Sequence, residues 1–240
     1  MAKKVKKLRL ILGDQLNHQH SWFQEEQDDT IYVLMEMRQE TDYTVHHIQK
    51  VVGFFLAMQN FAEYLTNRQY EVIYYHINDK ENNQTLAENL KQLIKKNDIE
   101  KFEYQLPDEY RLDQQLKEIC KSLSIDSEAY DTEHFLTKRN DLEKFYDGKK
   151  QMTMEYFYRD MRKKYDIMMA TKNDPEGGKW NFDKSNRKKW TGTPEIPHER
   201  GFRKDVSHLV KEIEQAGIKT MGNINEKSFN WPSSREDSLS

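Results

Sequence analysis

The sequence predicts an α/β protein with a five-stranded parallel, Rossmann-like sheet flanked by helices, followed by further helices and a long loop. Two observations carry this prediction. Short apolar runs alternate with helical apolar stripes, and the connections have the length of β–α–β crossovers. Aromatic residues make up 12% of the 240 residues, which indicates a real core although charged residues reach 33%.

Five segments have the composition of buried strands, being rich in β-branched and aromatic residues and bounded by turn residues. These predicted strands are residues 8–12, 30–36, 71–76, 101–105 and 125–130. Ligands of parallel sheets bind beyond the carboxyl ends of the strands, near the point where strand order reverses. The turns that follow the first two strands are therefore the expected pocket.

Apolar residues recur with a helical period between the strands. The predicted helices of the sheet region cover residues 45–65, 85–97 and 112–123, and later ones cover 141–147, 154–165 and 206–216. Residues 171–197 contain three prolines and little periodicity. A loop of that length is usually functional or a linker.

We expect three parts: an α/β domain over residues 1–135, a helical segment with a long linker over 136–200, and a last part over 201–240. In the last part, serines at 233 and 234 precede acidic residues, which is typical of a helix start. The sequence ends before a full turn, so it looks cut short.

Charge is unevenly distributed along the chain. Residues 138–189 hold 15 Lys and Arg against 9 Asp and Glu, a local charge of +6, whereas the remainder carries −9. Basic residues interleaved with aromatic ones can hold phosphates and stack on bases. A solvated helix face over core aromatics explains the same pattern.

The turn after the first strand has neither a dinucleotide fingerprint nor a phosphate loop, so we expect a ligand other than a triphosphate. Asp14 and Gln15 can accept from and donate to the edge of a planar heterocycle. Glu36 and Glu40 can hydrogen-bond sugar-like hydroxyls, although a solvated surface carboxylate explains Glu40 equally well. Phe54 and its neighbours on the helix could supply apolar walls, or simply pack on the sheet.

Metal and redox chemistry receive little support. The sequence brings four histidines near acidic residues, but no pair has the spacing that places two ligands on one helical face. We expect helix-start or pocket roles, and no metal site, for His18, His20, His46 and His47. The single cysteine, Cys120, excludes a multi-cysteine cluster within this chain and lies on an apolar stripe, so we predict a core role for it. Without a membrane-length apolar run, a cytoplasmic protein is expected.

Several ordered strings point to one family. The first is Leu10-Ile11-Leu12-Gly13-Asp14-Gln15-Leu16, and the longest are MEYFYRDMR at 154–162 and GGKWNFDKSNR at 177–187. These strings resemble the deoxyribodipyrimidine photolyase-related proteins, which are the prokaryotic (6-4) photolyases or iron–sulfur bacterial cryptochromes and photolyases. The resemblance covers nearly the whole chain.

The resemblance implies an antenna domain and interdomain linker of a light-driven DNA-repair flavoprotein. In the family, a helical half holds FAD and a four-cysteine [4Fe–4S] cluster. We expect both groups only in that half, which is missing here or is a separate chain, and we expect no repair activity from this chain alone. The family's antenna is 6,7-dimethyl-8-ribityllumazine, and position by position the resemblance assigns its binding to Gly13, Asp14, Gln15, Glu36, Glu40 and Phe54.

The resemblance also places the linker over the DNA-binding side, where DNA or the helical half would be contacted by Lys179, Asp183, Arg187 and Lys188. Two alternatives stay open. One is a stand-alone α/β module that binds a small molecule or nucleotide and has no DNA role. The other is a blue-light signalling domain that docks to a separately encoded flavin domain.

Overall fold

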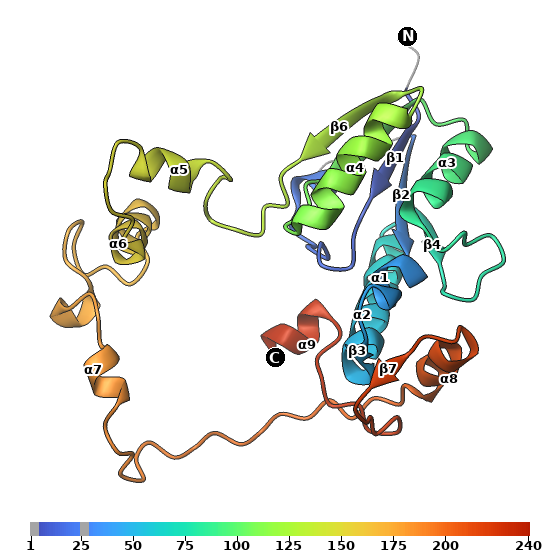
Figure 1. The fold of residues 1–240 in the computed structure, drawn as a ribbon. Helices are drawn as coiled ribbons and strands as arrows, with labels where there is room; N and C mark the ends of the chain where they lie inside the picture. The colour runs from blue at the N-terminus through green and yellow to red at the C-terminus, as the bar shows by residue number, and fades with distance from the viewer. Residues whose placement is uncertain (1–4, 25–28) are drawn as a thin grey trace. The chain divides into compact units, whose positions relative to one another are not determined.

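The computed structural model describes residues 5–24 and 29–240. It divides into two compact units, which we treat separately (Figure 1). Unit 1 combines the described part of residues 1–134 with residues 200–240, and unit 2 comprises residues 135–199. The segment after residue 200 therefore folds with the sheet rather than with the residues that precede it.

Unit 1 is built on a five-stranded, all-parallel sheet, which confirms the predicted fold class. The strand order is β4-β2-β1-β5-β6. The strands are β1 (Lys7–Leu10), β2 (Thr30–Met35), β4 (Glu71–Tyr75), β5 (Lys101–Gln105) and β6 (Asp126–Tyr130). Every residue of β2 is buried, as its continuous apolar run predicts for a strand inside a parallel sheet.

Helices cover both faces of this sheet (Figure 1). On one face lie α3 (Leu86–Lys96) and α4 (Tyr110–Ser122), whose leucines pack against β1, β2 and β5. The other face is covered by α2 (Ile48–Asn67). Cys120 is partly buried against the first of these layers, in agreement with the predicted core role.

The segment after residue 200 packs on the first half of α2. Leu209 and Ile213 of α8 (Ser207–Gln215) are buried against Val52 and Phe55. A two-residue strand, β7 (Thr220–Met221), pairs in parallel with β3 (His46–His47). The prediction that the long helix begins at residue 45 is therefore wrong, because this pairing holds the two histidines in an extended conformation.

Three short helices complete unit 1. They are η1 (Ser21–Phe23), α1 (Arg38–Asp42) and α9 (Arg235–Leu239). The predicted helix start near the end of the sequence is confirmed in α9, where Ser234 and Asp237 form a reciprocal capping box. By contrast, α1 replaces the turn that we predicted after β2.

Unit 2 contains the predicted helices α5 (Asp141–Tyr146) and α6 (Met154–Tyr165). The stretch predicted as an irregular loop also holds short helices, η2 (Glu176–Gly178) and α7 (Asp183–Asn186). Trp180 fixes this stretch to α6, since the charged groups of Arg159, Arg162 and Lys163 lie 5.3 to 5.5 Å from its ring.

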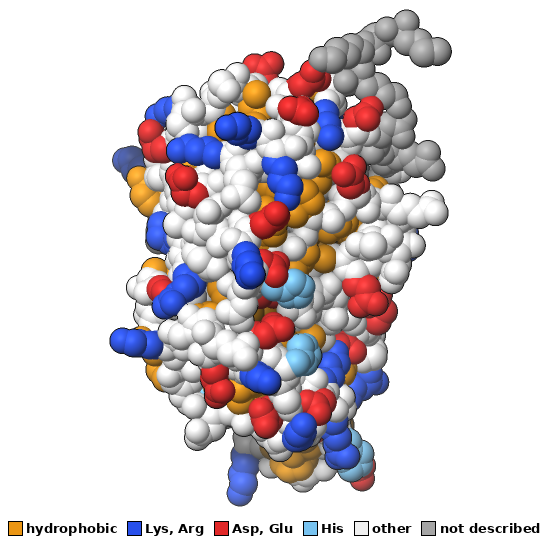
Figure 2. Space-filling view, turned by 90° about the vertical axis from the view of Figure 1, so that its right-hand side faces the viewer, with side chains coloured by type: hydrophobic (Ala, Val, Ile, Leu, Met, Phe, Trp, Pro, Cys, Tyr) orange, Lys and Arg blue, Asp and Glu red, His pale blue; other side chains and the backbone are white. Residues whose placement is uncertain are grey.

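The surface of unit 1 is polar and mixed in charge. Figure 2 shows acidic and basic side chains interspersed over one face, with no field of a single sign. Nucleic-acid-binding domains usually cluster their basic residues on one face. Within the described residues, no helix is both long and apolar enough to cross a membrane.

Candidate functional site

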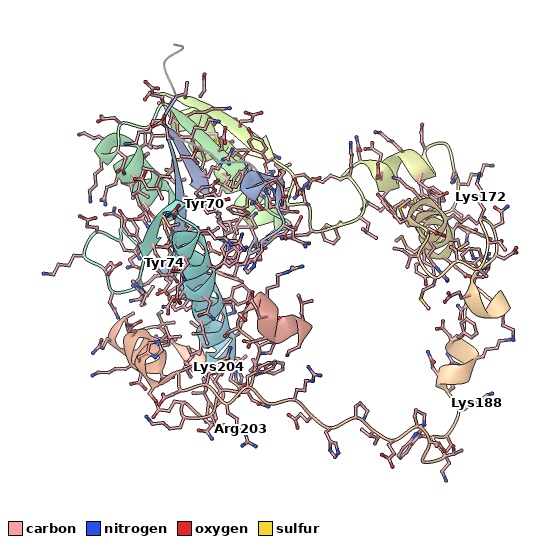
Figure 3. The ribbon with its side chains drawn as sticks, turned by 180° about the vertical axis from the view of Figure 1, so that it is seen from behind. Tyr70, Tyr74, Lys172, Lys188, Arg203 and Lys204 are labelled. Atoms are coloured by element: carbon pink, nitrogen blue, oxygen red, sulfur yellow. The ribbon has the colours of Figure 1, made fainter. Side chains whose placement is uncertain are left out.

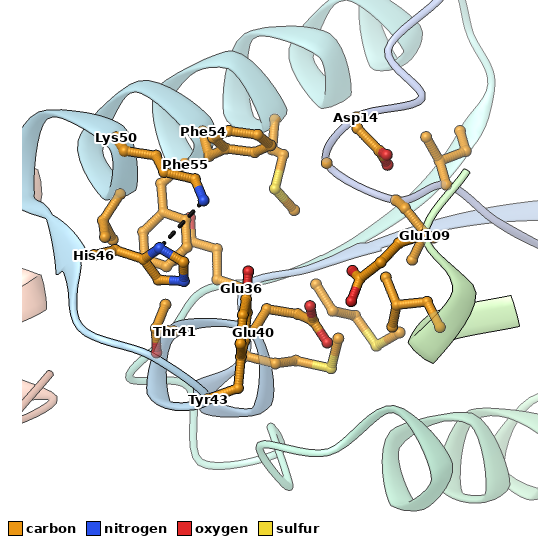
Figure 4. Close-up of a pocket in the computed structure, with 18 of the residues that line it drawn as sticks. Asp14, Glu36, Glu40, Thr41, Tyr43, His46, Lys50, Phe54, Phe55 and Glu109 are labelled. Carbon is orange, nitrogen blue, oxygen red and sulfur yellow. Dashed lines mark hydrogen bonds between the residues drawn. The ribbon is translucent and has the colours of Figure 1, made fainter. Parts of the chain in front are cut away.

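A pocket opens at the carboxyl ends of β1, β2 and β5, with a cavity of about 250 Å³. The chain leaves β1 towards β2 and leaves β5 towards β6, on opposite sides, so strand order reverses here. This is where ligands of open parallel sheets bind. The polar and aromatic side chains that line it are Asp14, Glu36, Glu40, Thr41, Tyr43, His46, Lys50, Phe54, Phe55 and Glu109 (Figure 4).

One wall of the pocket is apolar and comes from α2. Phe54 is 42% exposed, so part of its ring remains open to a ligand, whereas Phe55 and Met58 are buried. A Cβ atom on Gly13 would lie 3.0 Å from Met58 Sδ and 3.1 Å from Phe54 Cδ1. Gly13 therefore lets the turn after β1 approach α2 more closely than any other residue could.

The opposite wall carries carboxyl groups. Asp14 stands at the mouth, where desolvation raises the pKa of its carboxyl group. Glu40 is an ion-pair partner of Arg111, with 2.7 Å between Oε2 and Nη2. Arg111 also lies 4.6 Å from the centre of the Tyr43 ring. Glu40 is thus an oriented group of the pocket rim rather than a freely solvated carboxylate.

Glu36 lines the pocket, but its side-chain oxygens are already engaged. Its Oε1 accepts hydrogen bonds from the hydroxyl of Tyr74 (labelled in Figure 3) at 2.6 Å and from Gln59 Nε2 at 2.8 Å. Its Oε2 accepts one from the Ile77 amide at 2.8 Å. Burial raises the pKa of this carboxyl group, and the hydrogen bonds oppose that rise.

The structure places Gln15 outside the pocket lining. Its side chain is buried and folds back, with Oε1 accepting from the Leu12 amide at 3.0 Å and Nε2 donating to the Gln105 carbonyl at 3.2 Å. These bonds satisfy backbone groups at the ends of β1 and β5. Gln15 thus shapes the turn that presents Gly13 and Asp14.

Lys50 and Glu109 line the pocket but received no role from sequence reasoning, whereas a pocket role was among those expected for His46. His46 and Lys50 are in contact, with 3.1 Å between Nδ1 and Nζ, and they place a cation beside the Phe54 ring at 5.8 Å (Figure 4). Glu109 comes from the loop after β5, and nothing in the local sequence relates it to Asp14.

Of the other three histidines, His20 and His47 cap helices, in agreement with the expected helix-start role, whereas His18 has a packing role that was not predicted. The His18 ring stacks on Tyr64 with 3.7 Å between ring centres, and a ring nitrogen of buried His20 lies 2.8 Å from the Asp131 carbonyl. His47 Nδ1 accepts a hydrogen bond from the Gln49 amide and so caps α2. These histidines and His46 do not converge on one point.

In unit 2, the four predicted contact residues are all exposed: Lys179, Asp183, Arg187 and Lys188. They flank or belong to α7, and Asp183 begins that helix. The side chain of Lys188 projects away from the backbone in Figure 3. All four side chains are therefore exposed to solvent within unit 2.

The fold and the pocket define a class: a parallel α/β protein with a ligand-sized site at the switch point of its sheet. Residues 9–231 match the family described as deoxyribodipyrimidine photo-lyase-related protein, and the chain belongs to this family.

Two relatives extend the comparison. Over 185 residues, 76% of this chain, the sequence is 34% identical to a (6-4) photolyase of Agrobacterium fabrum. It is also 29% identical over 145 residues to an uncharacterized protein, R852, of Acanthamoeba polyphaga mimivirus. These 145 residues are 59% of this chain and 71% of that protein. The match spans only 36% of the length of the Agrobacterium protein.

Proposed function

We propose that unit 1 is the antenna-chromophore domain of a photolyase-like protein and that its pocket binds 6,7-dimethyl-8-ribityllumazine. The observation that carries the proposal is the pairing of an open aromatic face, Phe54, with the carboxyl groups of Asp14 and Glu40 at the switch point. Membership of the photolyase-related family supports it, as does similarity to a protein named (6-4) photolyase.

The chemistry of the pocket suits such a ligand. A planar ring can stack on Phe54, and carboxylate oxygens can accept hydrogen bonds from ribityl hydroxyls. Desolvation raises the pKa of Asp14 above its ordinary value, and the carboxyl oxygens of Asp14 can accept a hydrogen bond from a ring N–H group. The cavity of about 250 Å³ lies just below the usual range of ligand pockets, about 300–1,000 Å³, so the pocket would enclose part of such a ligand.

In this role the domain absorbs near-UV or blue light and passes the excitation to a flavin. FAD and the [4Fe–4S] cluster belong to a helical half outside these 240 residues, which would be the principal partner of the chain. DNA repair then requires that half, and the chain alone is expected to leave (6-4) lesions unrepaired under light.

The chromophore can be identified directly. The 240-residue protein is incubated with excess lumazine, freed of unbound ligand, and denatured, and the released compound is analysed by absorbance and mass. Release of one lumazine per chain is expected. Retention of no lumazine, or displacement of lumazine by FAD in a mixture of the two, contradicts the proposal.

The exposed basic residues of unit 2 favour a second role, contact with DNA. Residues 138–189 carry +6, and no Lys or Arg of the 179–189 stretch forms an ion pair within the described residues. A stand-alone ligand-binding module without a DNA role is the alternative. Lumazine binding without DNA binding would favour the module.

A further inference from the structure

Three side chains from distant parts of unit 1 converge beside the pocket wall. Glu36 follows β2, His76 follows β4, and Glu212 belongs to α8. One potential ligand atom from each lies within 4.8 Å of the other two. Residues this far apart in the sequence meet only because α8 packs at this end of the sheet.

The first of these groups is held rigidly. Glu36 is 1% exposed, and hydrogen bonds from Tyr74, Gln59 and the Ile77 amide fix the plane of its carboxyl group. Ligands of metal ions are commonly oriented by such outer hydrogen bonds. Among the described residues, Oε2 accepts one hydrogen bond, from the Ile77 amide, so a lone pair of Oε2 remains available.

The second carboxyl group is incompletely satisfied. The Glu212 carbonyl accepts a hydrogen bond from Asn78 Nδ2 at 2.9 Å, which fixes this turn of α8 beside the loop after β4. Its side-chain Oε2 is buried and has no hydrogen-bond partner among the described residues. A buried polar atom without a hydrogen-bond partner destabilises the folded state.

The two carboxyl groups also lack a basic partner. Within residues 5–24 and 29–240, neither Glu36 nor Glu212 forms an ion pair with Lys or Arg. A cation bound between them would supply the missing positive charge, since buried carboxyl groups are usually paired with a cation or coordinate a metal ion.

We propose that Glu36, His76 and Glu212 bind a divalent transition-metal ion of the zinc type. Imidazole and carboxylate ligands together suit Zn²⁺, whereas Mg²⁺ and Ca²⁺ prefer oxygen ligands alone. Zinc–ligand bonds are about 2.0–2.2 Å long, so bound ligand atoms lie about 3–4 Å apart. His76 is exposed, its ring centre lies 4.8 Å from that of Tyr74, and its Nδ1 lies 3.5 Å from Gln59 Nε2. A small movement of this side chain completes the set, with water as a further ligand.

The ion would join the ends of β2 and β4 to α8. It would therefore fasten the segment after residue 200 to the sheet, beside the wall of the ligand pocket that Glu36 forms. This inference does not rest on the identity of the ligand in that pocket, and it stands or falls by a separate experiment.

Calorimetric titration of the chelator-treated 240-residue protein with ZnCl₂ tests the site. The wild type is expected to bind one ion saturably, and His76→Gln and Glu212→Gln are each expected to weaken binding at least tenfold. The matched controls are His208→Gln and Glu214→Gln, which change exposed residues of the same helix, α8, outside the cluster. Both controls should bind as the wild type does.

Circular dichroism verifies that each variant remains folded, and X-ray absorption at the zinc edge identifies the ligands. Nitrogen and oxygen ligands without sulfur are expected, which separates this site from Cys120. The absence of saturable zinc binding would overturn the proposal. So would undiminished binding by both cluster variants, or equally tight binding of MgCl₂.

Discussion

Gly13 determines how closely the turn after β1 approaches α2. We predict that Gly13→Ala weakens lumazine binding about tenfold and lowers the free energy of unfolding by about 1–3 kcal/mol, as overpacking does. The reason is that the new Cβ atom would lie 3.0 Å from Met58 Sδ and 3.1 Å from Phe54 Cδ1, so the aromatic wall must shift. Fluorescence titration and denaturant unfolding measure the two effects.

Gly53→Ala is the matched control for this substitution. Gly53 lies within α2, and its added Cβ atom would meet only Phe229 Cζ, at an ordinary 3.6 Å. Alanine in a helix interior is expected to leave stability unchanged or to raise it by up to about 1 kcal/mol. Equal lumazine affinity and equal stability of Gly13→Ala and the wild type would contradict the role assigned to Gly13.

At the scale of elements, β1 and β5 are joined by a buried ionic group. Glu103 is fully buried, and its carboxylate contacts Arg9 at 2.7 Å, Lys101 at 3.0 Å and Lys7 at 3.6 Å. Burial alone would raise the pKa of Glu103, but hydrogen bonds from Arg9 and Lys101 hold it below the ordinary 4.5. The charged form is therefore the one that stabilises the sheet.

We predict that Glu103→Gln lowers the free energy of unfolding at pH 7 by about 3–5 kcal/mol, because Arg9 is left buried without its counter-ion. A pKa that is lower in the folded state contributes stability above the ordinary value of 4.5. That contribution disappears as the pH falls through the lowered pKa of the folded state. The difference between variant and wild type should therefore shrink below pH 4.5, as measured by denaturant unfolding.

Glu118→Gln is the control, since Glu118 is 71% exposed in its pair with Lys121. An exposed pair of this kind contributes about 0–1 kcal/mol. If Glu103→Gln were as mild as Glu118→Gln, or if its effect did not vary with pH, the buried ionic group would not stabilise the sheet as described.

The elements themselves show what the sequence could predict. Strand β2 and helices α3 and α4 follow from local apolar patterns, since burial of those residues within one element decides their structure. The start of α2 was not predictable in this way. It depends on pairing between β3 and β7, which are separated by more than 170 positions in the sequence.

The candidate site follows the same division. Gly13, Asp14 and Glu40 were predictable because they follow two strands whose carboxyl ends meet at one edge of the sheet. Glu109 and Glu212 reach their places only through tertiary packing, which no local pattern records. Gln15 fits the local pattern equally well, yet its side-chain amide forms hydrogen bonds with backbone groups at the ends of β1 and β5 and does not line the pocket.

At the scale of the whole molecule, the two units are proposed to divide ligand binding and DNA contact. We predict that the triple change of Lys179, Arg187 and Lys188 to Ala weakens binding to non-specific duplex DNA. The plot of log affinity against log salt has a negative slope, and each lost phosphate contact makes that slope shallower by about 0.9. The three substitutions together should reduce its magnitude by about 3. Fluorescence anisotropy at several salt concentrations measures it.

A triple change of Lys91, Lys117 and Lys121 to Ala provides the control, because it removes the same charge from helices α3 and α4 of unit 1. It should alter DNA binding much less. Equal losses in the two triple variants would indicate an unspecific effect of net charge, and no DNA binding by the wild type at low salt would contradict the proposed contact.

The account as a whole depends on the pocket at the ends of β1, β2 and β5. The most direct test is a fluorescence titration of the 240-residue protein with 6,7-dimethyl-8-ribityllumazine. We predict saturation at one ligand per chain, and at least a fivefold loss of affinity in Phe54→Ala, because stacking on an aromatic face contributes about 1–3 kcal/mol. Phe135→Ala, which changes an exposed ring of unit 2, should bind normally. Absence of saturable binding, or equal affinity of Phe54→Ala and the wild type, would contradict the account.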